Sequence, residues 1–209
     1  MSDPPATAPS TPRSSWQQQR DEEVADAGKF IAQLEDLQKN ERGQMAALRR
    51  NAGEMLTGRG TAWFYSLLPR NRKKYREVYF LTATLFDFNR IRGVSGNFGS
   101  AVLRLATATG KLPKEFRRFH ILIDAEFEQV YDRDDPDEPW SSGGGQLAYR
   151  LRQMVKLLAS NGIGIDWAEL LVDLCHWSDP NRQIQKKWAR TFFGDAPPPI
   201  TPADDRSDD

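Results

Sequence analysis

The amino-acid sequence predicts an all-α protein, and three observations lead to that fold class. Apolar residues recur at three- and four-residue spacing along most of the 209 positions, which is the period of a helix with one buried face. No long segment shows the strict alternation of apolar and polar residues that marks a half-buried strand. Hydrophobic residues make up 39% of the chain, enough to bury one sizeable core or two small ones.

The two ends of the chain differ from the rest in composition. Residues 1–20, which include PPATAPSTP, and residues 195–209, DAPPPITPADDRSDD, are rich in Pro, Ser, Thr and Asp. They offer almost no apolar surface whose burial could offset the entropy lost on ordering. We therefore expect a disordered tail over 1–20 and a disordered acidic tail over 195–209.

Helices of the first half are predicted from their apolar residues in chain order. The first is marked by Phe30, Leu34 and Leu37, the second by Met45 and Leu48, the third by Trp63, Phe64, Leu67 and Leu68 before Pro69, and a longer fourth by Tyr75, Val78, Tyr79, Thr82, Leu85 and Phe86. A glycine-rich loop, IRGVSGNFGS at 91–100, then leads to a short helix through Ala101, Leu105 and Ala108. Gly110 supplies the stop, because glycine readily adopts the left-handed conformation of a C-terminal cap.

The second half begins with a helix after Pro113, in KEFRRFHILIDAEFEQV, and continues with a flexible loop, DRDDPDEPWSSGGG at 132–145. Three helices are expected after that loop. The first carries the apolar stripe Leu147, Leu151, Met154 and Leu158. The second opens with DWAE, a capping box in which Asp166 accepts from the Glu169 amide and the Glu169 side chain reaches back.

The last predicted helix separates packing from charge. We expect it to open at Asp179 and Pro180, an N-cap followed by a proline at the first helical position. Its apolar residues are Ile184, Trp188 and Phe192, and a basic series two positions earlier consists of Arg182, Lys186 and Arg190. The two series lie on opposite sides of the helix axis, so one face packs and the other is basic.

Charge is unevenly placed along a chain whose formal net charge is zero. Residues 39–118 hold 17 Lys and Arg against 5 Asp and Glu, a local balance of +12. Residues 124–138 hold 8 acidic residues and a single arginine. Because salt limits the reach of exposed charges to about 8–10 Å, the local balance matters more to a polyanionic partner than the total.

The chemistry of an enzyme is not visible in the sequence. The two histidines, His120 and His176, lie in no catalytic or metal-ligating spacing, and glycines 93, 96 and 99 lack the strand and the lysine that a phosphate-binding loop needs. The acidic residues Asp132, Asp134, Asp135 and Asp137 fail the calcium-loop pattern, because Pro136 and Asp137 stand where a ligand and the required glycine belong. We expect no catalytic residue, no metal and no cofactor.

Targeting signals are equally scarce. The single Cys175 excludes an intramolecular disulfide, and no apolar run is long enough to cross a membrane. The N-terminal residues match no export signal. A cytoplasmic location and no membrane contact are expected.

Five segments together carry a family resemblance. They are GxxAxLRR at Gly43 to Arg50, WFYSLLP at 63–69, GNFGSAVLRLA at 96–106, LRQMVKLLASNGIGIDWAELLVDLCHW at 151–177 and QKKWARTFFG at 185–194. In this order they resemble the CasB family, the small subunit of the type I-E CRISPR effector complex, Cascade. The resemblance spans about residues 22–194, and it does not include the acidic insertion or the tails.

The resemblance implies a fold, a function and partners. It implies two small helical bundles in one chain, with an N-terminal bundle over 21–112 and a C-terminal bundle over 113–194, and no enzymatic activity. It implies that a pair of copies contacts the other Cascade subunits, guide RNA (crRNA) and target DNA, and helps to hold the opened DNA, the R-loop. Base pairing with the guide reads the sequence, so such a subunit needs only sequence-independent phosphate contacts.

Eight cations are the candidate nucleic-acid-binding residues. Arginine suits phosphate because its planar fork makes bidentate contacts. Our first choices are Arg49, Arg50, Arg117, Arg118, Arg152 and Lys156, and our second are Arg90 and Arg92. By contrast, Trp63, Trp167, Trp177 and Trp188 stand among leucines at helical spacing and are expected in the core rather than as base-stacking surfaces.

Two other function classes stay open at this point. A helical adaptor could use the same basic surface to bind an acidic protein, with no affinity for DNA or RNA. A stand-alone nucleic-acid-binding regulator would need sequence preference and usually a helix-turn-helix, yet the helix pairs here lack a polar recognition helix. Co-elution with a complex that carries a guide RNA would separate these classes from a Cascade subunit.

Overall fold

The computed structural model describes residues 15–56, 60–131, 139–141 and 144–194. Its helices are α1 (Ser15–Asn40), α2 (Arg42–Arg50), α3 (Arg76–Phe86), α4 (Phe98–Thr109), α5 (Leu112–Ile123), α6 (Gly145–Ser160), α7 (Trp167–Cys175) and α8 (Gln183–Phe193). Two 3-10 helices, η1 (Ala62–Ser66) and η2 (Arg70–Tyr75), connect α2 to α3. The expected all-α fold is confirmed.

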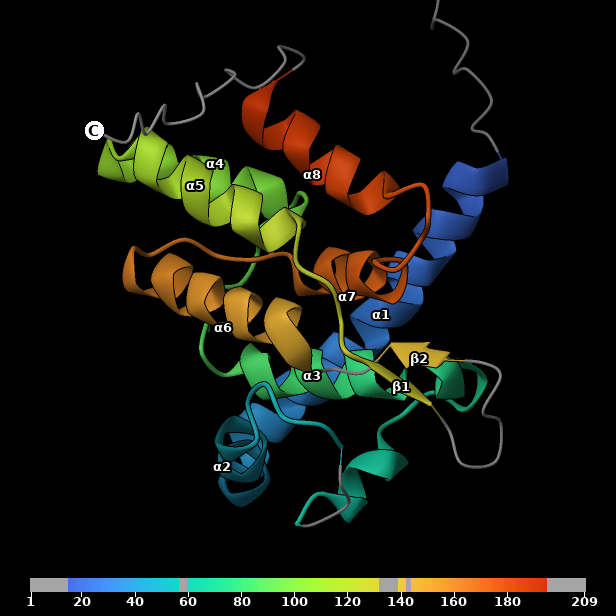
Figure 1. The fold of residues 1–209 in the computed structure, drawn as a ribbon. Coiled ribbons are helices and arrows are strands. Elements are labelled where there is room, and N and C mark those ends of the chain that lie inside the picture. The colour runs from blue at the N-terminus through green and yellow to red at the C-terminus, as the bar shows by residue number, and fades with distance from the viewer. Residues whose placement is uncertain (1–14, 57–59, 132–138, 142–143, 195–209) are drawn as a thin grey trace, which may run out of the picture.

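The helices stack in three levels in the view of Figure 1. Helices α4, α5 and α8 lie at the top, α6 and α7 in the middle, and α3 and α2 below, while α1 crosses behind from α7 towards α2. Their buried apolar side chains form one continuous core, and α3 lies deepest in it, with every residue from Glu77 to Phe86 buried. Burial on all sides explains why α3 reads as nearly all apolar.

The packing pairs connect distant parts of the chain. Helix α1 packs against α7, and α4 packs against both α5 and α8. These contacts cross residue 112, where the resemblance implies a division into two bundles. That division stays a prediction.

Helix α1 begins earlier than predicted. The sequence predicts a disordered tail through residue 20, but residues 15–20 form the first turns of α1. The reason is a long-range contact, because the Arg20 guanidinium donates to Glu169 and Asp173 of α7. A tail predicted from local composition misses such a partner. Residues 1–14 and 195–209 lie outside the described residues.

Two of the predicted helix caps are confirmed. The Asp166 carboxylate accepts from the Glu169 amide at 3.1 Å, although the Glu169 carboxylate accepts from Arg20 and Lys187 rather than reaching back. Gly110 adopts φ 64° after α4, the left-handed conformation expected of a helix stop.

The start of α8 differs from the prediction. The helix begins at Gln183 and not at Asp179, whose carboxylate accepts from the Asn181 amide at 2.7 Å and forms a turn instead. The division of α8 into two faces is confirmed, because Ile184, Trp188 and Phe192 are buried and the basic series is exposed. A Cβ on Gly99 of α4 would lie 2.3 Å from the Trp188 carbonyl oxygen, so this glycine allows the two helices to meet closely.

A short antiparallel hairpin interrupts the helical pattern between α5 and α6. Its strands are β1 (Gln129–Tyr131) and β2 (Pro139–Ser141), with Val130 paired to Trp140. The predicted flexible loop over 132–145 therefore contains a strand. The acidic residues Asp132, Asp134, Asp135 and Asp137, considered above as metal ligands, lie outside the described residues.

Candidate nucleic-acid interface

Helix α2 ends with the two adjacent arginines that the sequence singles out. Met45 and Leu48 are buried and hold α2 against α1 and α3. Successive helical positions lie about 100° apart, so the two residues after Leu48 turn away from this packed face. Arg49 and Arg50 are both exposed, and α2 lies at the lower edge of the molecule (Figure 1).

Arg49 is held by a buried carboxylate. The Asp87 side chain, at the end of α3, is only 4% exposed. It accepts from Gln38 Nε2 at 2.7 Å, Arg49 Nη1 at 3.1 Å and Arg90 Nε at 2.9 Å. We call these four residues, Gln38, Arg49, Asp87 and Arg90, the Asp87 cluster. It gathers two guanidinium groups around a single carboxylate, which leaves one excess positive charge at the surface.

The Arg92 side chain is more deeply buried than those of Arg49 and Arg90. Its guanidinium lies 3.2 Å from Glu35, donates to Gln38 and to the Asn89 carbonyl, and lies 4.0 Å from the ring centre of Phe86. Burial outweighs the attraction of nearby carboxylates and lowers the pKa of Arg92 below its ordinary value, although arginine still carries its charge. These contacts commit its donors to the protein, so Arg92 stabilises the segment after α3.

Two cations of helix α6 contact Phe88, which belongs to the segment that follows α3. The Arg152 guanidinium lies 5.8 Å and the Lys156 ammonium 4.5 Å from the centre of the Phe88 ring, which are cation–π distances. Arg152 also donates to the Ala52 carbonyl at 3.1 Å and is half-buried, whereas Lys156 is exposed. Five of the eight candidates therefore meet at residues 87–92: Arg49, Arg90, Arg92, Arg152 and Lys156.

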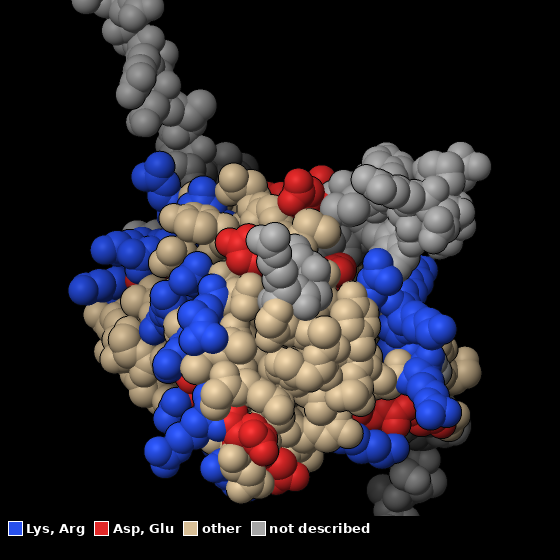
Figure 2. Space-filling model, turned by 90° about the horizontal axis from the view of Figure 1, so that it is seen from below, with Lys and Arg blue, Asp and Glu red and all other residues tan. Residues whose placement is uncertain are grey.

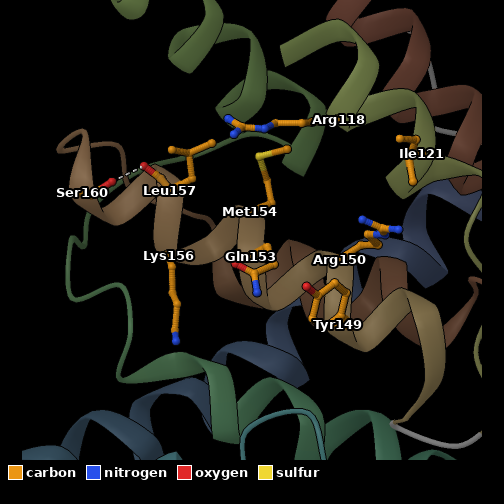
Figure 3. Close-up of a pocket in the computed structure, with 9 residues that line it drawn as sticks. All are labelled: Arg118, Ile121, Tyr149, Arg150, Gln153, Met154, Lys156, Leu157 and Ser160. Carbon is orange, nitrogen blue, oxygen red and sulfur yellow. Dashed lines mark hydrogen bonds between the residues drawn. The ribbon is translucent and has the colours of Figure 1, made fainter. Parts of the chain in front are cut away.

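Helix α5 contributes two further candidates, and the eighth is Arg50 of α2, described above. Arg118 donates to the buried Glu115 at 3.0 Å and lines a hollow between α5 and α6 together with Lys156 (Figure 3). Arg117 is exposed, does not line this hollow, and forms no ion pair within the described part of the chain. Arg118 and Lys156 thus line the same hollow, although the Lys156 side chain points away from Arg118 (Figure 3) and lies over the Phe88 ring, and Arg117 stays apart from the group.

Other exposed cations were not among the candidates. Figure 2 shows Lys and Arg gathered on two sides of the molecule, with mostly uncharged surface between them, and the group on the left lies on the side of α2. Arg70, Lys73 and Lys74 of η2 are exposed, and so is Arg150 of α6, which lines the hollow beside Lys156. The basic run RNRKKYR at 70–76 could have indicated the three η2 residues from the sequence alone. Arg150 could have been found only from the placement of α5 beside α6.

Metal-ligating side chains are not gathered in the part of the chain that the structure describes. No group of three or more His, Cys, Asp or Glu there could hold a metal ion. His176 lies 2.7 Å from Glu23, and burial raises the pKa of the neighbouring Cys175 thiol, which keeps it protonated and unreactive. Among the helices so described, none is long and apolar enough to cross a membrane.

The class of protein that fold and surface define is an all-α binding protein whose basic side chains project from several helices. Comparison with known proteins makes the class specific. The family model for CRISPR-associated protein Cse2 matches residues 44–193. The chain belongs to the Cse2 family, and the resemblance to CasB drawn from the sequence is confirmed.

Individual relatives agree with this assignment. A CRISPR-associated protein Cse2 of Thermus thermophilus is 33% identical over 124 residues, which are 59% of this chain and 60% of that protein. The crystal structure of a Cse2-family protein from the same organism has a TM-score of 0.61 at 29% identity, covering 80% of this chain and 97% of that one. The crystal structure of M. ruber CasB has a TM-score of 0.58 at 27% identity, covering 81% and 93%.

A chain of a solved CRISPR RNA-guided surveillance complex shares the fold. Its TM-score is 0.62, and the match covers 82% of this chain and 93% of that one. Because the identity is 19%, this likeness concerns the fold alone.

Proposed function

We propose that this chain is a non-catalytic small subunit of a type I-E CRISPR RNA-guided surveillance complex. In that role it contacts the nucleic-acid backbone without regard to sequence, and it stabilises target DNA binding and the displaced strand of the R-loop. Its partners are the other subunits, a second copy of itself, the guide RNA and the target DNA. Family membership and the shared fold of a surveillance-complex chain support the proposal.

The observation that carries the nucleic-acid contact is the imbalance of the Asp87 cluster. Two guanidinium groups share one carboxylate, and the side chains of Arg49 and Arg90 are 51% and 65% exposed. The carboxylate fixes each group at one edge while other N–H donors remain open to solvent. A phosphate would meet preorganised, charge-assisted donors at this site.

The eight candidates divide into two roles. Exposed cations are assigned to phosphate contact: Arg49, Arg50, Arg90, Arg117, Arg118 and Lys156. Arg92 and Arg152 are half-buried and donate to protein oxygens, so they position the neighbouring segments. The exposed contacts would carry no base specificity, because phosphates are the same at every position.

The test compares charge reversals in a reconstituted effector complex. An Arg49→Glu, Arg50→Glu double variant should weaken binding to unrelated target sequences about equally. The log–log salt slope should flatten by roughly 0.7 for each phosphate of a single strand that the variant no longer neutralises. The matched control is a Lys29→Glu, Lys186→Glu double variant, which reverses as much charge at exposed positions on α1 and α8.

Three results would speak against the proposal. Unchanged affinity and slope would remove the two arginines from the interface, and an equal loss of affinity in the control would show a general charge effect. Failure of a folded double variant to join the complex would indicate a protein–protein role, which is the adaptor alternative.

A further inference from the structure

A hollow between α5 and α6 combines features that phosphate binding alone does not need. Its volume is about 590 Å³, within the range of about 300–1,000 Å³ that is usual for small-molecule sites. Arg118 and Ile121 extend from α5, and the other side chains come from α6 (Figure 3).

The charge of the hollow is positive. Three of its lining residues are cations and none is an acid. Arg118 shares a carboxylate with the protein, but the described contacts of Arg150 and Lys156 are with the rings of Tyr149 and Phe88, at 5.5 and 4.5 Å. Two of the three cations therefore have no carboxylate partner among the described residues, and an anionic group is the complementary occupant.

The hollow also exposes apolar surface. Tyr149 and Ile121 are 53% and 39% exposed, although residues of this size and apolar character are usually buried. Leu157, which is half-buried, continues this surface between the two helices, whereas Met154 also lines the hollow but is only 4% exposed. An exposed aromatic ring beside unpaired cations is the combination on which single-stranded nucleic acids bind, because a base stacks on the ring while its phosphates meet the cations.

The four tryptophans that the sequence places in the core do not compete with Tyr149 as stacking surfaces. Trp167, Trp177 and Trp188 are at most 2% exposed, as the sequence predicts for core residues, and Trp63 is half-buried. Tyr149 begins a row along one face of α6 that continues through Gln153, Lys156 and Ser160 at four-, three- and four-residue steps. Aromatic ring, amide, ammonium and hydroxyl groups therefore follow one another along the hollow.

We propose that the hollow between α5 and α6 holds an unpaired nucleotide of a single strand. The base stacks on Tyr149 beside the exposed Ile121, and the adjoining phosphates contact Arg118, Arg150 and Lys156. A paired base inside a duplex is already stacked on both faces, so the site selects unpaired over paired strands. This inference rests on the proposed function, which supplies the strand, and adds a base contact to backbone contacts.

The test separates the contribution of the base to binding affinity from that of the backbone, because it compares two strands that carry the same phosphates. The full-length chain is titrated, by fluorescence anisotropy at one salt concentration, with a labelled oligonucleotide and with an abasic strand of equal length. Stacking of one base on an aromatic side chain changes affinity by about 5- to 150-fold. The wild-type chain should therefore prefer the normal strand by a factor in this range, and deoxyribose and ribose versions show which sugar the site accepts.

Substitutions assign the preference to Tyr149. Tyr149→Ala should reduce affinity for the normal strand to that for the abasic strand, with the latter unchanged. Tyr149→Phe should keep the preference because it keeps the ring. The control is Tyr65→Ala, which removes an exposed tyrosine from η1, outside the hollow, and should change neither affinity. A 2-aminopurine base in the strand should lose fluorescence on binding to wild type and to Tyr149→Phe, but less to Tyr149→Ala.

Each contrary result has its own meaning. Equal wild-type affinity for the normal and abasic strands, or an equal drop in affinity for both with Tyr149→Ala, would overturn the base contact and leave the backbone contacts standing. Absence of any strand binding by the wild-type chain would count against the nucleic-acid contacts of the proposed function itself, and the inference would fall with it. Stronger binding to an acidic peptide than to either strand would also overturn the inference.

Discussion

Two groups of charged residues in this molecule use the same side-chain types in opposite ways. One is the Asp87 cluster. The other, which we call the Asp173 cluster, consists of Arg20, Glu169, Asp173, Lys187 and Trp188. It joins α1, α7 and α8, and its Asp173 side chain is fully buried and accepts from Arg20, Lys187 and the Trp188 indole, the last at 2.6 Å.

The difference lies in charge balance and exposure. The Asp173 cluster pairs two cations with two carboxylates, and its Arg20 and Lys187 side chains are 13% and 29% exposed. The Asp87 cluster pairs two cations with one carboxylate, and both cations are more than half exposed. A balanced, buried group stabilises the fold if its hydrogen bonds are satisfied, whereas an unbalanced, exposed group contributes little stability and keeps charge for a partner.

The largest expected effect follows from removing the charge of Asp173. Asp173→Asn leaves Arg20 and Lys187 with one carboxylate inside the protein. We expect a loss of about 3–5 kcal/mol in the free energy of unfolding, because unpaired buried charges are costly. Urea denaturation followed by tryptophan fluorescence measures it. Asp87→Asn is the matched control and should cost about 1–2 kcal/mol, because water can solvate Arg49 and Arg90. Equal costs would show that the two clusters do not differ in the way described.

A smaller loss is expected from Arg20→Ala. The change removes hydrogen bonds to two carboxylates, each of which keeps Lys187, and should cost about 2 kcal/mol. Thermal unfolding measures the change, with Lys29→Ala on the exposed side of α1 as the control that leaves the midpoint unchanged. An unaltered midpoint in Arg20→Ala would mean that residues 15–20 contribute nothing to the fold, as their composition suggests.

Acid should weaken the Asp173 cluster. Burial raises the pKa of Glu169, but hydrogen bonds from Lys187 and Arg20 outweigh it and hold that pKa below its ordinary value of 4.5. A lowered carboxyl pKa contributes stability above the unfolded value, and that contribution is lost as pH falls below 4.5 through the folded value. The urea midpoint should therefore decline below pH 4.5, and less steeply in Glu169→Gln.

Glu77 should change the pH dependence of stability in the direction opposite to Glu169. Burial raises its pKa, so its contribution is present at low pH and is lost as pH rises through the folded value. Glu77→Gln should consequently steepen the acid decline that Glu169→Gln flattens. Parallel curves for the two variants would contradict these signs.

The smallest expected effect on stability belongs to Arg90→Ala. An exposed ion pair contributes about 0–1 kcal/mol, and Asp87 keeps Gln38 and Arg49 as donors. The same variant should nevertheless weaken single-strand binding and flatten its salt slope. A stability loss similar to that of Arg20→Ala would show that Arg90 belongs to the structure rather than to the binding surface.

Local patterns predicted much of the fold because the forces behind them are local. The helical period, the cap at Asp166 and the glycine stop at Gly110 each depend on residues a few positions apart. Errors appear where a partner is distant or where two local signals compete. Residues 15–20 have the composition of a tail but meet α7, and Asp179 looks like an N-cap but forms a turn before α8.

Sequence by itself determined the all-α fold, the apolar face of α8, the family and the basic residues available for binding. Only the tertiary structure decided which of those residues are committed to the protein, because the deciding carboxylates are remote along the chain. Arg49 meets Asp87 across 38 positions, and Arg20 meets Asp173 across 153. The hollow beside Tyr149 likewise exists only where α5 and α6 pack together. The charge of a residue and the spacing of apolar residues can be read from neighbouring positions in the sequence. Burial and ion pairing depend on tertiary contacts between residues that are distant along the chain.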